Sequence, residues 1–274
     1  MEVAMQTMLI GREIEEYGAY EALRRMHETG CRCFEVSGHI DLNDQTIDEM
    51  KRAVHDFDLK VCALSVEYTG RVQRKSLFPG HRQLSLLNDF EGCVHIAKEL
   101  GCDTLRFAGM PVASFTDEAA MHDYFAFTEA LAVKLAAEGI TLCAHNHESE
   151  FIRMNGKTVW EWSLELCPHL HYEMDLFGVQ MAGMSPLDYL EKSAGRTDLL
   201  HYSDITVVMN DDPHDLNGMI RRVPLGLGNV NTAAVKHCAE RTGVSYFIIE
   251  ASESKEYSGY DVIKTALENY EKLV

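Results

Sequence analysis

A repeat of short apolar segments, each followed by a longer stretch with helical periodicity, most strongly constrains the fold of this chain. The segments expected to be strands are residues 3–8, 32–37, 60–67, 103–109, 140–146, 170–176, 199–205 and 244–252. Strands that alternate with helices form right-handed βαβ units and a parallel sheet. Eight such units in 274 residues predict an α/β protein with a single closed (β/α)8 TIM barrel.

The stretches between these segments carry helix signals. Residues 43–57, 121–139 and 260–274 repeat apolar side chains with the period of a helix. The first begins with plausible capping residues and places four apolar side chains on one face: Ile47, Met50, Val54 and Phe57. Glycine commonly ends a helix before a strand, and four positions fit this pattern: Gly30, Gly101, Gly139 and Gly243.

An open doubly wound sheet is the alternative arrangement of such units. It would need a glycine-rich turn after the first strand, and "QTMLIGREIEE" is a poor match. No linker or change in composition divides the chain, so residues 1–274 are expected to form one domain. The longer gaps after Glu67 and around Asn210 to Asn229 are expected to be loops or lids.

Charge and composition exclude several classes of protein. The chain has 25 Lys and Arg against 43 Asp and Glu, a formal charge of −18, and no basic stripe, so nucleic acid is not expected as a partner. No run approaches about 18 apolar residues, so no membrane span is expected. The first residues lack the basic region of a signal peptide. Eight scattered cysteines without a CxxC pair are interpreted as buried free thiols in a reducing cytoplasm.

Functional groups of a TIM barrel lie at the C-terminal ends of its strands. The polar residues at these ends are Gln6, Glu35, Glu67, Arg106, His145, His147, Glu148, Glu150, Asp175, His201, Asp204 and Glu250. Each alone would more often be a helix cap or a surface group, but several acids and imidazoles meeting at one rim need a cation. Asp175, His201, Glu250 and one group of the fifth strand would suit one divalent metal ion, without distinguishing Mn, Zn, Co, Mg or Fe.

Several motifs occur in the order and spacing of a known family: "VAMQT", "GCRCFEVSG", "AHNHESEF", "YEMDLFGVQMAG", "LLHYSDI", "VPLGLGNVN" and "YFIIEAS". Together they resemble the xylose-isomerase-like TIM barrels of the sugar phosphate isomerase/epimerase family. That family includes ketose 3-epimerases, inosose dehydratase and 3-dehydroshikimate dehydratase. The resemblance covers nearly the whole chain and implies a sugar or keto-polyol substrate, with a homo-oligomer as an option.

The resemblance also implies a ligand set for one divalent metal ion: His145, Asp175, His201 and Glu250. Many relatives have a glutamate where this chain has His145, so His147 or Glu148 is an alternative ligand. Relatives often carry a lysine in a His-x-Lys-Asp pattern after the seventh strand. Here the stretch reads "HYSD", with Ser203 in that place, which argues against a phosphorylated substrate.

The family chemistry is proton abstraction next to a carbonyl, with a metal ion stabilising the enediolate as a Lewis acid. Glu250 is expected to be both ligand and base, and His147 to carry a proton beside the metal. Glu150 is a candidate for orienting an imidazole or for the second acid/base, with a solvated loop carboxylate as the other interpretation. The candidates for substrate binding are Gln6, Glu35, Arg106 and Arg222, and Glu35 could instead be salt-bridged scaffolding.

The leading hypothesis is therefore a metal-dependent sugar isomerase or epimerase. Its nearest alternative is a lyase or dehydratase on the same scaffold, acting on an inosose or eliminating from a keto-glycoside. An AP-endonuclease-like barrel shares the fold, but it would need more metal ligands and a basic groove. A non-catalytic sugar-binding or partner subunit is the remaining alternative, supported by Ser203 in place of the lysine.

Overall fold

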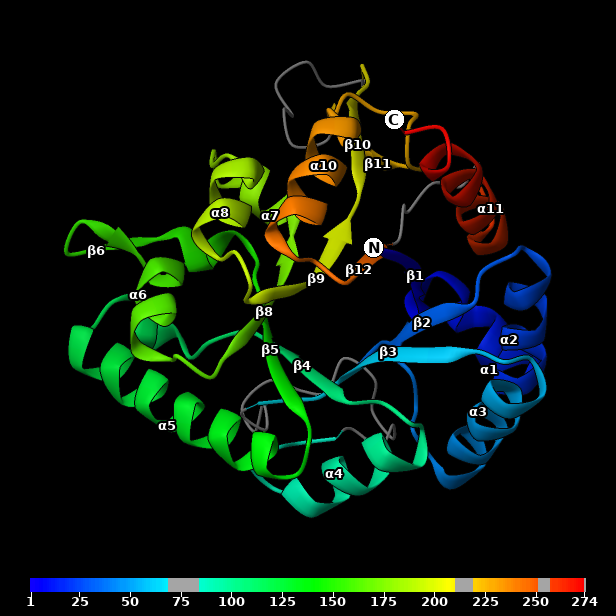
Figure 1. Ribbon diagram of the computed structural model, residues 1–274, viewed down its shortest axis with the longest axis horizontal. Helices are drawn as coiled ribbons and strands as arrows, with labels where there is room; N and C mark the ends of the chain where they lie inside the picture. Colours follow the sequence, from blue (N-terminus) through cyan, green and yellow to red (C-terminus); the bar gives the residue numbers. More distant parts are fainter. Residues whose placement is uncertain (69–83, 210–218, 251–256, 274) are drawn as a thin grey trace.

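The computed structural model describes residues 1–68, 84–209, 219–250 and 257–273. Eight parallel strands form a closed barrel, which confirms the predicted fold (Figure 1). In their order around the barrel these strands are β1 (Glu2–Gln6), β12 (Tyr246–Ile249), β9 (Thr197–Tyr202), β8 (His171–Asp175), β5 (Thr141–His145), β4 (Thr104–Ala108), β3 (Lys60–Ser65) and β2 (Cys33–Val36). The C-terminal ends of these strands therefore meet at one rim.

Helices surround the barrel (Figure 1). The α-helices are α1 (Gly11–Tyr17), α2 (Ala19–Glu28), α3 (Asp44–Asp56), α4 (Phe90–Glu99), α5 (Glu118–Ala137), α6 (Val159–Leu166), α7 (Leu176–Met181), α8 (Pro186–Lys192), α10 (Thr232–Thr242) and α11 (Gly259–Tyr270). In the described part of the chain, three short 3-10 helices follow strand ends: η1 (Thr7–Ile10), η2 (Val112–Phe115) and η3 (Glu148–Phe151).

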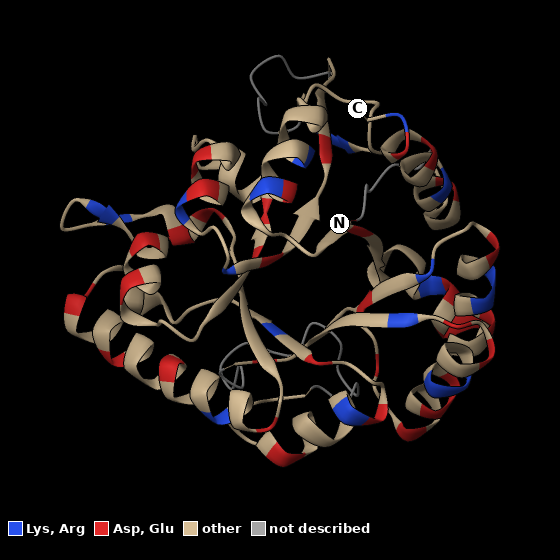
Figure 2. Cartoon of the chain, viewed as in Figure 1, with Lys and Arg blue, Asp and Glu red and all other residues tan. Residues whose placement is uncertain are grey.

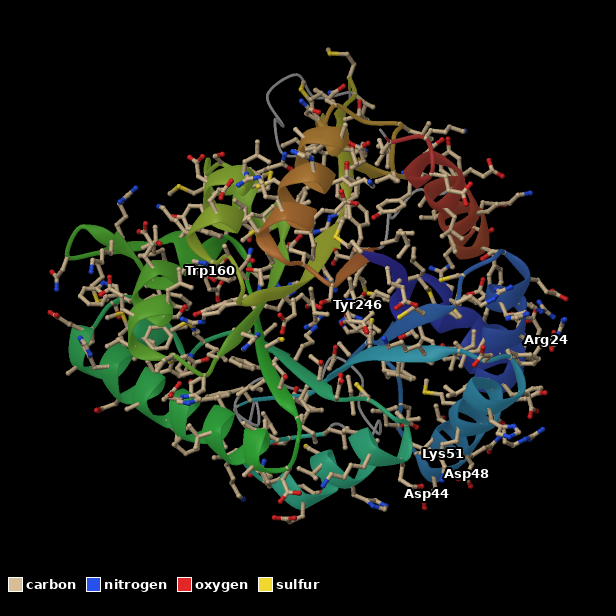
Figure 3. All side chains as sticks on the ribbon, in the orientation of Figure 1. Arg24, Asp44, Asp48, Lys51, Trp160 and Tyr246 are labelled. Carbon is tan, nitrogen blue, oxygen red and sulfur yellow. The ribbon has the colours of Figure 1, made fainter. Side chains whose placement is uncertain are left out.

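Local sequence explains where these helices begin, end and face. Asn43 caps α3, because its side chain accepts a hydrogen bond from the Thr46 backbone N–H at 3.0 Å. Ile47 and Met50 of this helix are buried, as the periodicity predicted. Gly243 ends α10 in the left-handed conformation, with φ of 93°. Arg24 on α2 and Asp44, Asp48 and Lys51 on α3 point away from the barrel (Figure 3).

Ala, Cys, Leu and Ile side chains of the strands form a separate small hydrophobic cluster in the barrel. Its buried members are Ala4, Cys33, Cys62, Ala63, Cys143, Leu199 and Ile248. A larger cluster packs between the outer face of the strands and the helices. All eight cysteines are buried and none forms a disulfide, as expected from their scattered positions.

The structure departs from the expected elements in three places. β1 ends at Gln6, and the next four residues form η1 instead of continuing the strand. The region after the seventh strand contains an antiparallel hairpin of β10 (Asp204–Val207) and β11 (Ile220–Val223) rather than only a loop. A second small hairpin joins β6 (Arg153–Met154) to β7 (Lys157–Thr158). The centres of the two expected lids, residues 69–83 and 210–218, lie outside the described residues.

Charged residues are spread over the outer helices, with Asp and Glu interspersed among Lys and Arg (Figure 2). In this view the basic residues do not gather into a stripe. Among the helices that the structure describes, none has the length and apolarity needed to cross a bilayer.

Candidate functional site

A buried ion-pair cluster forms the floor of the rim. The Arg106 Nε atom on β4 lies 2.9 Å from Glu35 Oε1 on β2 and 2.9 Å from Glu173 Oε2 on β8. Both carboxylates are fully buried. Ser65 adds a hydrogen bond of 3.1 Å to Glu35. Two carboxylates share one guanidinium, so the second carboxylate is left to interact with the imidazoles above it.

Two imidazoles stand against this floor. His145 Nδ1, at the end of β5, lies 2.8 Å from Glu173 Oε2. His201 Nε2, on β9, lies 2.6 Å from Glu35 Oε2 and 3.2 Å from Glu173 Oε1. The His201 N–H hydrogen-bonds to Glu35, which leaves Glu173 Oε1 without a hydrogen bond. The two imidazole rings are 4.9 Å apart between centroids.

The surroundings shift the pKa values of the two imidazoles in opposite directions. Burial, with Arg106 adding to it, lowers the pKa of His145 to about 3, so this ring is neutral. Burial also disfavours the charged form of His201, but the carboxylates of Glu173 and Glu35 outweigh it and raise the His201 pKa well above its usual value. The pKa of Glu173 lies well below its ordinary value, because His201 and Arg106 outweigh its burial. Glu173 is therefore an ionised acceptor, and His145 Nδ1 carries the proton that it accepts.

Asp175 ends β8 and caps helix α7. Its Oδ1 accepts from the Phe177 N–H at 2.9 Å and its Oδ2 from the Gly178 N–H at 3.2 Å. The Asn146 amide holds the Asp175 backbone through bonds of 2.9 and 3.0 Å. Burial, and then the nearby charge of Glu250, raise the Asp175 pKa to about 7. The two carboxylates therefore repel each other, and a cation would relieve that repulsion.

Glu250 follows β12 and lies across from His201. Its Oε1 is 4.0 Å from His201 Nδ1, and that ring nitrogen is buried without a hydrogen-bond partner among the described residues. Its Oε2 accepts from Arg222 Nη1 at 2.8 Å and from Ser203 Oγ at 3.0 Å. Arg222 comes from β11 and stacks on the Phe177 ring at 4.1 Å. Burial raises the Glu250 pKa, but His201 and Arg222 outweigh it, and the pKa lies below its ordinary value.

One group of side chains could hold a metal ion. His145, Glu173 and His201 each offer a donor atom, and these donors lie within 4.8 Å of one another. Within the described ranges no other set of three His, Cys, Asp or Glu donors is this close. Asp175 and Glu250 border the same rim outside this tight group. The unpartnered His201 Nδ1 and the mutually repelling carboxylates above it fit a divalent cation at the rim.

The structure places the expected proton carriers beside this rim. His147 is exposed, and its ring centroid lies 5.0 Å from that of His145. Glu148 is exposed as well. Glu150 is buried, and its Oε2 accepts from the His147 backbone N–H at 2.8 Å and from Ser149 Oγ at 3.0 Å. Gln6 is buried at the end of β1, and its Oε1 has no hydrogen-bond partner in the described structure.

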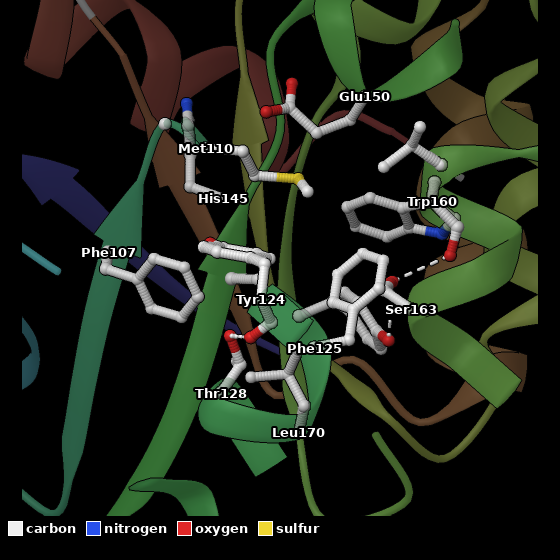
Figure 4. Close-up of a pocket in the computed structure, with 14 residues that line it drawn as sticks. Phe107, Met110, Tyr124, Phe125, Thr128, His145, Glu150, Trp160, Ser163 and Leu170 are labelled. Atoms are coloured by element: carbon white, nitrogen blue, oxygen red, sulfur yellow. Dashed lines mark hydrogen bonds between the residues drawn. The ribbon is translucent and has the colours of Figure 1, made fainter. Parts of the chain in front are cut away.

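A small cavity of about 20 Å³ lies beside His145, between the barrel and helices α5 and α6 (Figure 4). Its walls are mostly apolar and include Phe107, Met110 and Trp160. Glu150 also lines it, with Oε1 unpaired. The volume is enough for about one water molecule. The Glu150 carboxylate thus borders this cavity while its other oxygen fixes the turn that carries His147.

Sequence reasoning missed Glu173. The signal was present, because successive side chains of a strand alternate and Glu173 lies two residues before Asp175 in "HYEMD". Both therefore face the barrel interior. The prediction of His145 as a ligand did not include this carboxylate on the neighbouring strand, which lies 2.8 Å from its Nδ1.

The family model described as xylose isomerase-like TIM barrel matches residues 23–273. A sugar phosphate isomerase/epimerase from Parabacteroides distasonis superposes with a TM-score of 0.76 at 18% identity, over 99% of this chain and 98% of that one. The probable 3-DHS dehydratase of petrobactin synthesis from Bacillus anthracis gives 0.71 at 14% identity, over 99% of both chains.

The IolI protein, solved with a bound zinc atom, gives a TM-score of 0.69 at 15% identity, over 100% of this chain and 98% of that one. At these identities the likeness shows the fold alone. No curated protein matches the chain. Because the family model covers most of the sequence, this chain belongs to the xylose isomerase-like TIM barrel family.

Proposed function

We propose that this protein is a metal-dependent isomerase or epimerase that moves a proton on the carbon next to the carbonyl of a sugar or keto-polyol. The observation that carries this proposal is the pair formed by His201 and Glu250. A buried ring nitrogen without a partner lies 4.0 Å from a carboxylate oxygen at the mouth of the barrel. Asp175 and His145 border the same place, and such a donor set binds a divalent ion.

The residues that would hold the ion are His145, Asp175, His201 and Glu250. When bound, a divalent ion supplies positive charge that stabilises the oxygens of an enediolate. Two nitrogen and two oxygen donors suit Zn, Co, Mn or Fe, and they also relieve the repulsion between Asp175 and Glu250.

Glu250 is the base in this proposal. Arg222 and Ser203 engage its Oε2 and so fix the orientation of the carboxylate that takes the carbon-bound proton. His201 and Arg222 keep its pKa below the ordinary value, so the carboxylate is ionised at neutral pH. His147, beside His145 and open to solvent, is the proposed carrier of the second proton. Glu150 holds the backbone of His147 and so orients it.

Arg222 lowers the pKa of the Glu250 carboxylate and fixes its orientation. Replacing it by Leu removes a charge-assisted hydrogen bond and is expected to lower kcat/KM about 10- to 100-fold. The loss of Arg222 also removes a cause that lowers the Glu250 pKa. The acid limb of the pH–rate profile should therefore move to higher pH. Arg221→Leu, an exposed neighbour on β11, is the matched control and should leave the limb in place.

Deuterium incorporation tests the function directly. Purified protein with added divalent metal is incubated in deuterated water with ketoses and keto-inositols. Solvent deuterium at the carbon next to the carbonyl, without new unsaturation, supports an isomerase or epimerase. Loss of water or of an aglycone would instead make the protein a lyase, the activity suggested by the dehydratase relative. If no candidate turns over with any divalent metal while a sugar still binds, the protein is a non-catalytic binding subunit.

A further inference from the structure

Glu173 contacts Arg106 in the floor and both imidazole rings that stand against it. Its Oε2 lies 2.9 Å from Arg106 Nε and 2.8 Å from His145 Nδ1, and its Oε1 lies 3.2 Å from His201 Nε2. It is fully buried. Glu35 contacts Arg106 and His201, but it has no recorded contact with His145. Glu173 is thus the carboxylate that links the two imidazoles.

A carboxylate that contacts an imidazole decides which ring nitrogen keeps the proton. An ionised carboxylate only accepts hydrogen bonds, so the nitrogen that faces it must carry hydrogen. For His145 this is Nδ1, which leaves Nε2 with the free lone pair. For His201 the carboxylates face Nε2, and Nδ1 is the nitrogen left near Glu250. Each ring is therefore held by one nitrogen, and a metal ion that binds the other nitrogen would displace any proton there.

Arg106 alone does not account for the second carboxylate, which also faces the two imidazoles. Arg106 needs one buried carboxylate for charge balance, and Glu35 supplies it at 2.9 Å. Adding Glu173 costs further desolvation and places its carboxylate directly against the His145 and His201 rings. That charge makes both imidazoles stronger electron donors, as carboxylates behind metal-bound histidines do.

The geometry points to Glu173 as a positioning residue of the metal site, one that fixes His145 and His201 as nitrogen donors. This inference rests on the proposed function and deepens it. The chain carries His145 at the end of β5 and a carboxylate on the neighbouring strand β8, in contact with the imidazole. Nitrogen donors bind zinc-class ions well, whereas Mg²⁺ prefers oxygen, so the site should select zinc, cobalt or iron over magnesium.

The first test is the tautomer of His145 in the metal-free full-length protein. Long-range ¹H–¹⁵N spectra of protein labelled at histidine distinguish a proton on Nδ1 from one on Nε2. The wild-type protein should show His145 with the proton on Nδ1. A proton on Nε2 would overturn the inference, and this measurement needs neither metal, nor substrate, nor a stable variant.

The second test compares Glu173→Gln with Glu35→Gln. Both remove one buried floor carboxylate that contacts Arg106, but only Glu173 contacts His145. Glu173→Gln should raise the zinc Kd about 10- to 100-fold, measured by competition with a chelating dye, and should mix the His145 tautomers. Glu35→Gln should leave the His145 tautomer unchanged. Unchanged zinc affinity and an unchanged His145 spectrum in Glu173→Gln would contradict the inference.

A swap of the carboxylate supplies the third test. The double variant His145→Glu, Glu173→Gln places a carboxylate on β5 and removes the one on β8. The number of carboxylates therefore stays the same. This double variant should bind zinc less tightly and magnesium more tightly than the wild-type protein, because an oxygen donor replaces nitrogen. An unchanged zinc-to-magnesium preference would contradict the positioning role. Absence of turnover in the wild-type protein would contradict the proposed reaction alone, because all three readouts are binding or spectroscopic.

Discussion

Replacing Glu250 by Gln is expected to lower kcat about 1,000-fold while the melting temperature changes by only a few degrees. The substitution keeps the shape of the side chain but removes the ionised oxygen that takes the proton, and general base catalysis contributes about 10²–10⁴-fold. Arg222 and Ser203 can still hydrogen-bond to the amide oxygen, so the loop that carries residue 250 keeps its contacts.

Steady-state kinetics on the substrate that turns over, with thermal unfolding alongside, measure both quantities. Glu240→Gln is the matched control, because Glu240 is an exposed carboxylate on α10 that pairs only with Lys236 in the recorded ion pairs. It should keep wild-type activity. If Glu250→Gln retains more than about a tenth of the wild-type kcat, Glu250 is not the base.

Asp175→Asn is expected to stabilise the metal-free protein, and to do so more at pH 8 than at pH 5. Burial and Glu250 raise the Asp175 pKa in the folded state to about 7, well above the ordinary value of an aspartate. A raised pKa means that the protonated form stabilises the fold, and that stability is lost as pH rises through about 7. Asn keeps the cap of α7 and carries no charge, so it escapes this loss.

Melting temperatures in the presence of a chelator, at pH 5 and pH 8, test this prediction, with about 2–4 °C expected for each kcal/mol. Zinc should then raise the wild-type melting temperature at pH 8 more than at pH 5, because the ion binds the charged carboxylate. Asp175→Asn should lose most of this gain. The control Asp117→Asn changes the exposed cap of α5 and should behave as the wild type at both pH values. A destabilised Asp175→Asn protein at pH 8 without metal would contradict the pKa argument.

The barrel was readable from the sequence because its signals are local and repeated. Apolar strand segments, the helical period of 43–57 and the glycines before strands each depend on a few neighbouring residues. The hairpin of β10 and β11 was missed because the "DITV" segment continues directly from the seventh strand, and its partner lies across residues 210–218. Pairing between segments that far apart leaves little local signal.

The sequence predicted the rim and two residues of the floor, Glu35 and Arg106, but neither Glu173 nor how the floor is assembled. Strand ends must meet in a barrel, so His145, Asp175, His201 and Glu250 could be placed near one another from topology. The floor depends on how far each strand is shifted along its neighbours, because this shift brings Glu35, Arg106 and Glu173 to the same level of the barrel. The register that sets this depth contains irregularities between Phe34 and Glu35 and between Tyr172 and Glu173. Neither irregularity has a sequence signature.

A crystal structure of protein soaked with zinc or manganese, with anomalous data collected at the metal edge, tests the central claim most directly. The account predicts one ion at the rim, with a nitrogen of His145 and of His201 and an oxygen of Asp175 and of Glu250 about 2.0–2.3 Å away. Glu173 should remain bound to His145 Nδ1 and Arg106, outside the ligand shell. A structure with no ion at this rim, or with an ion that touches neither His201 nor Glu250, would contradict it.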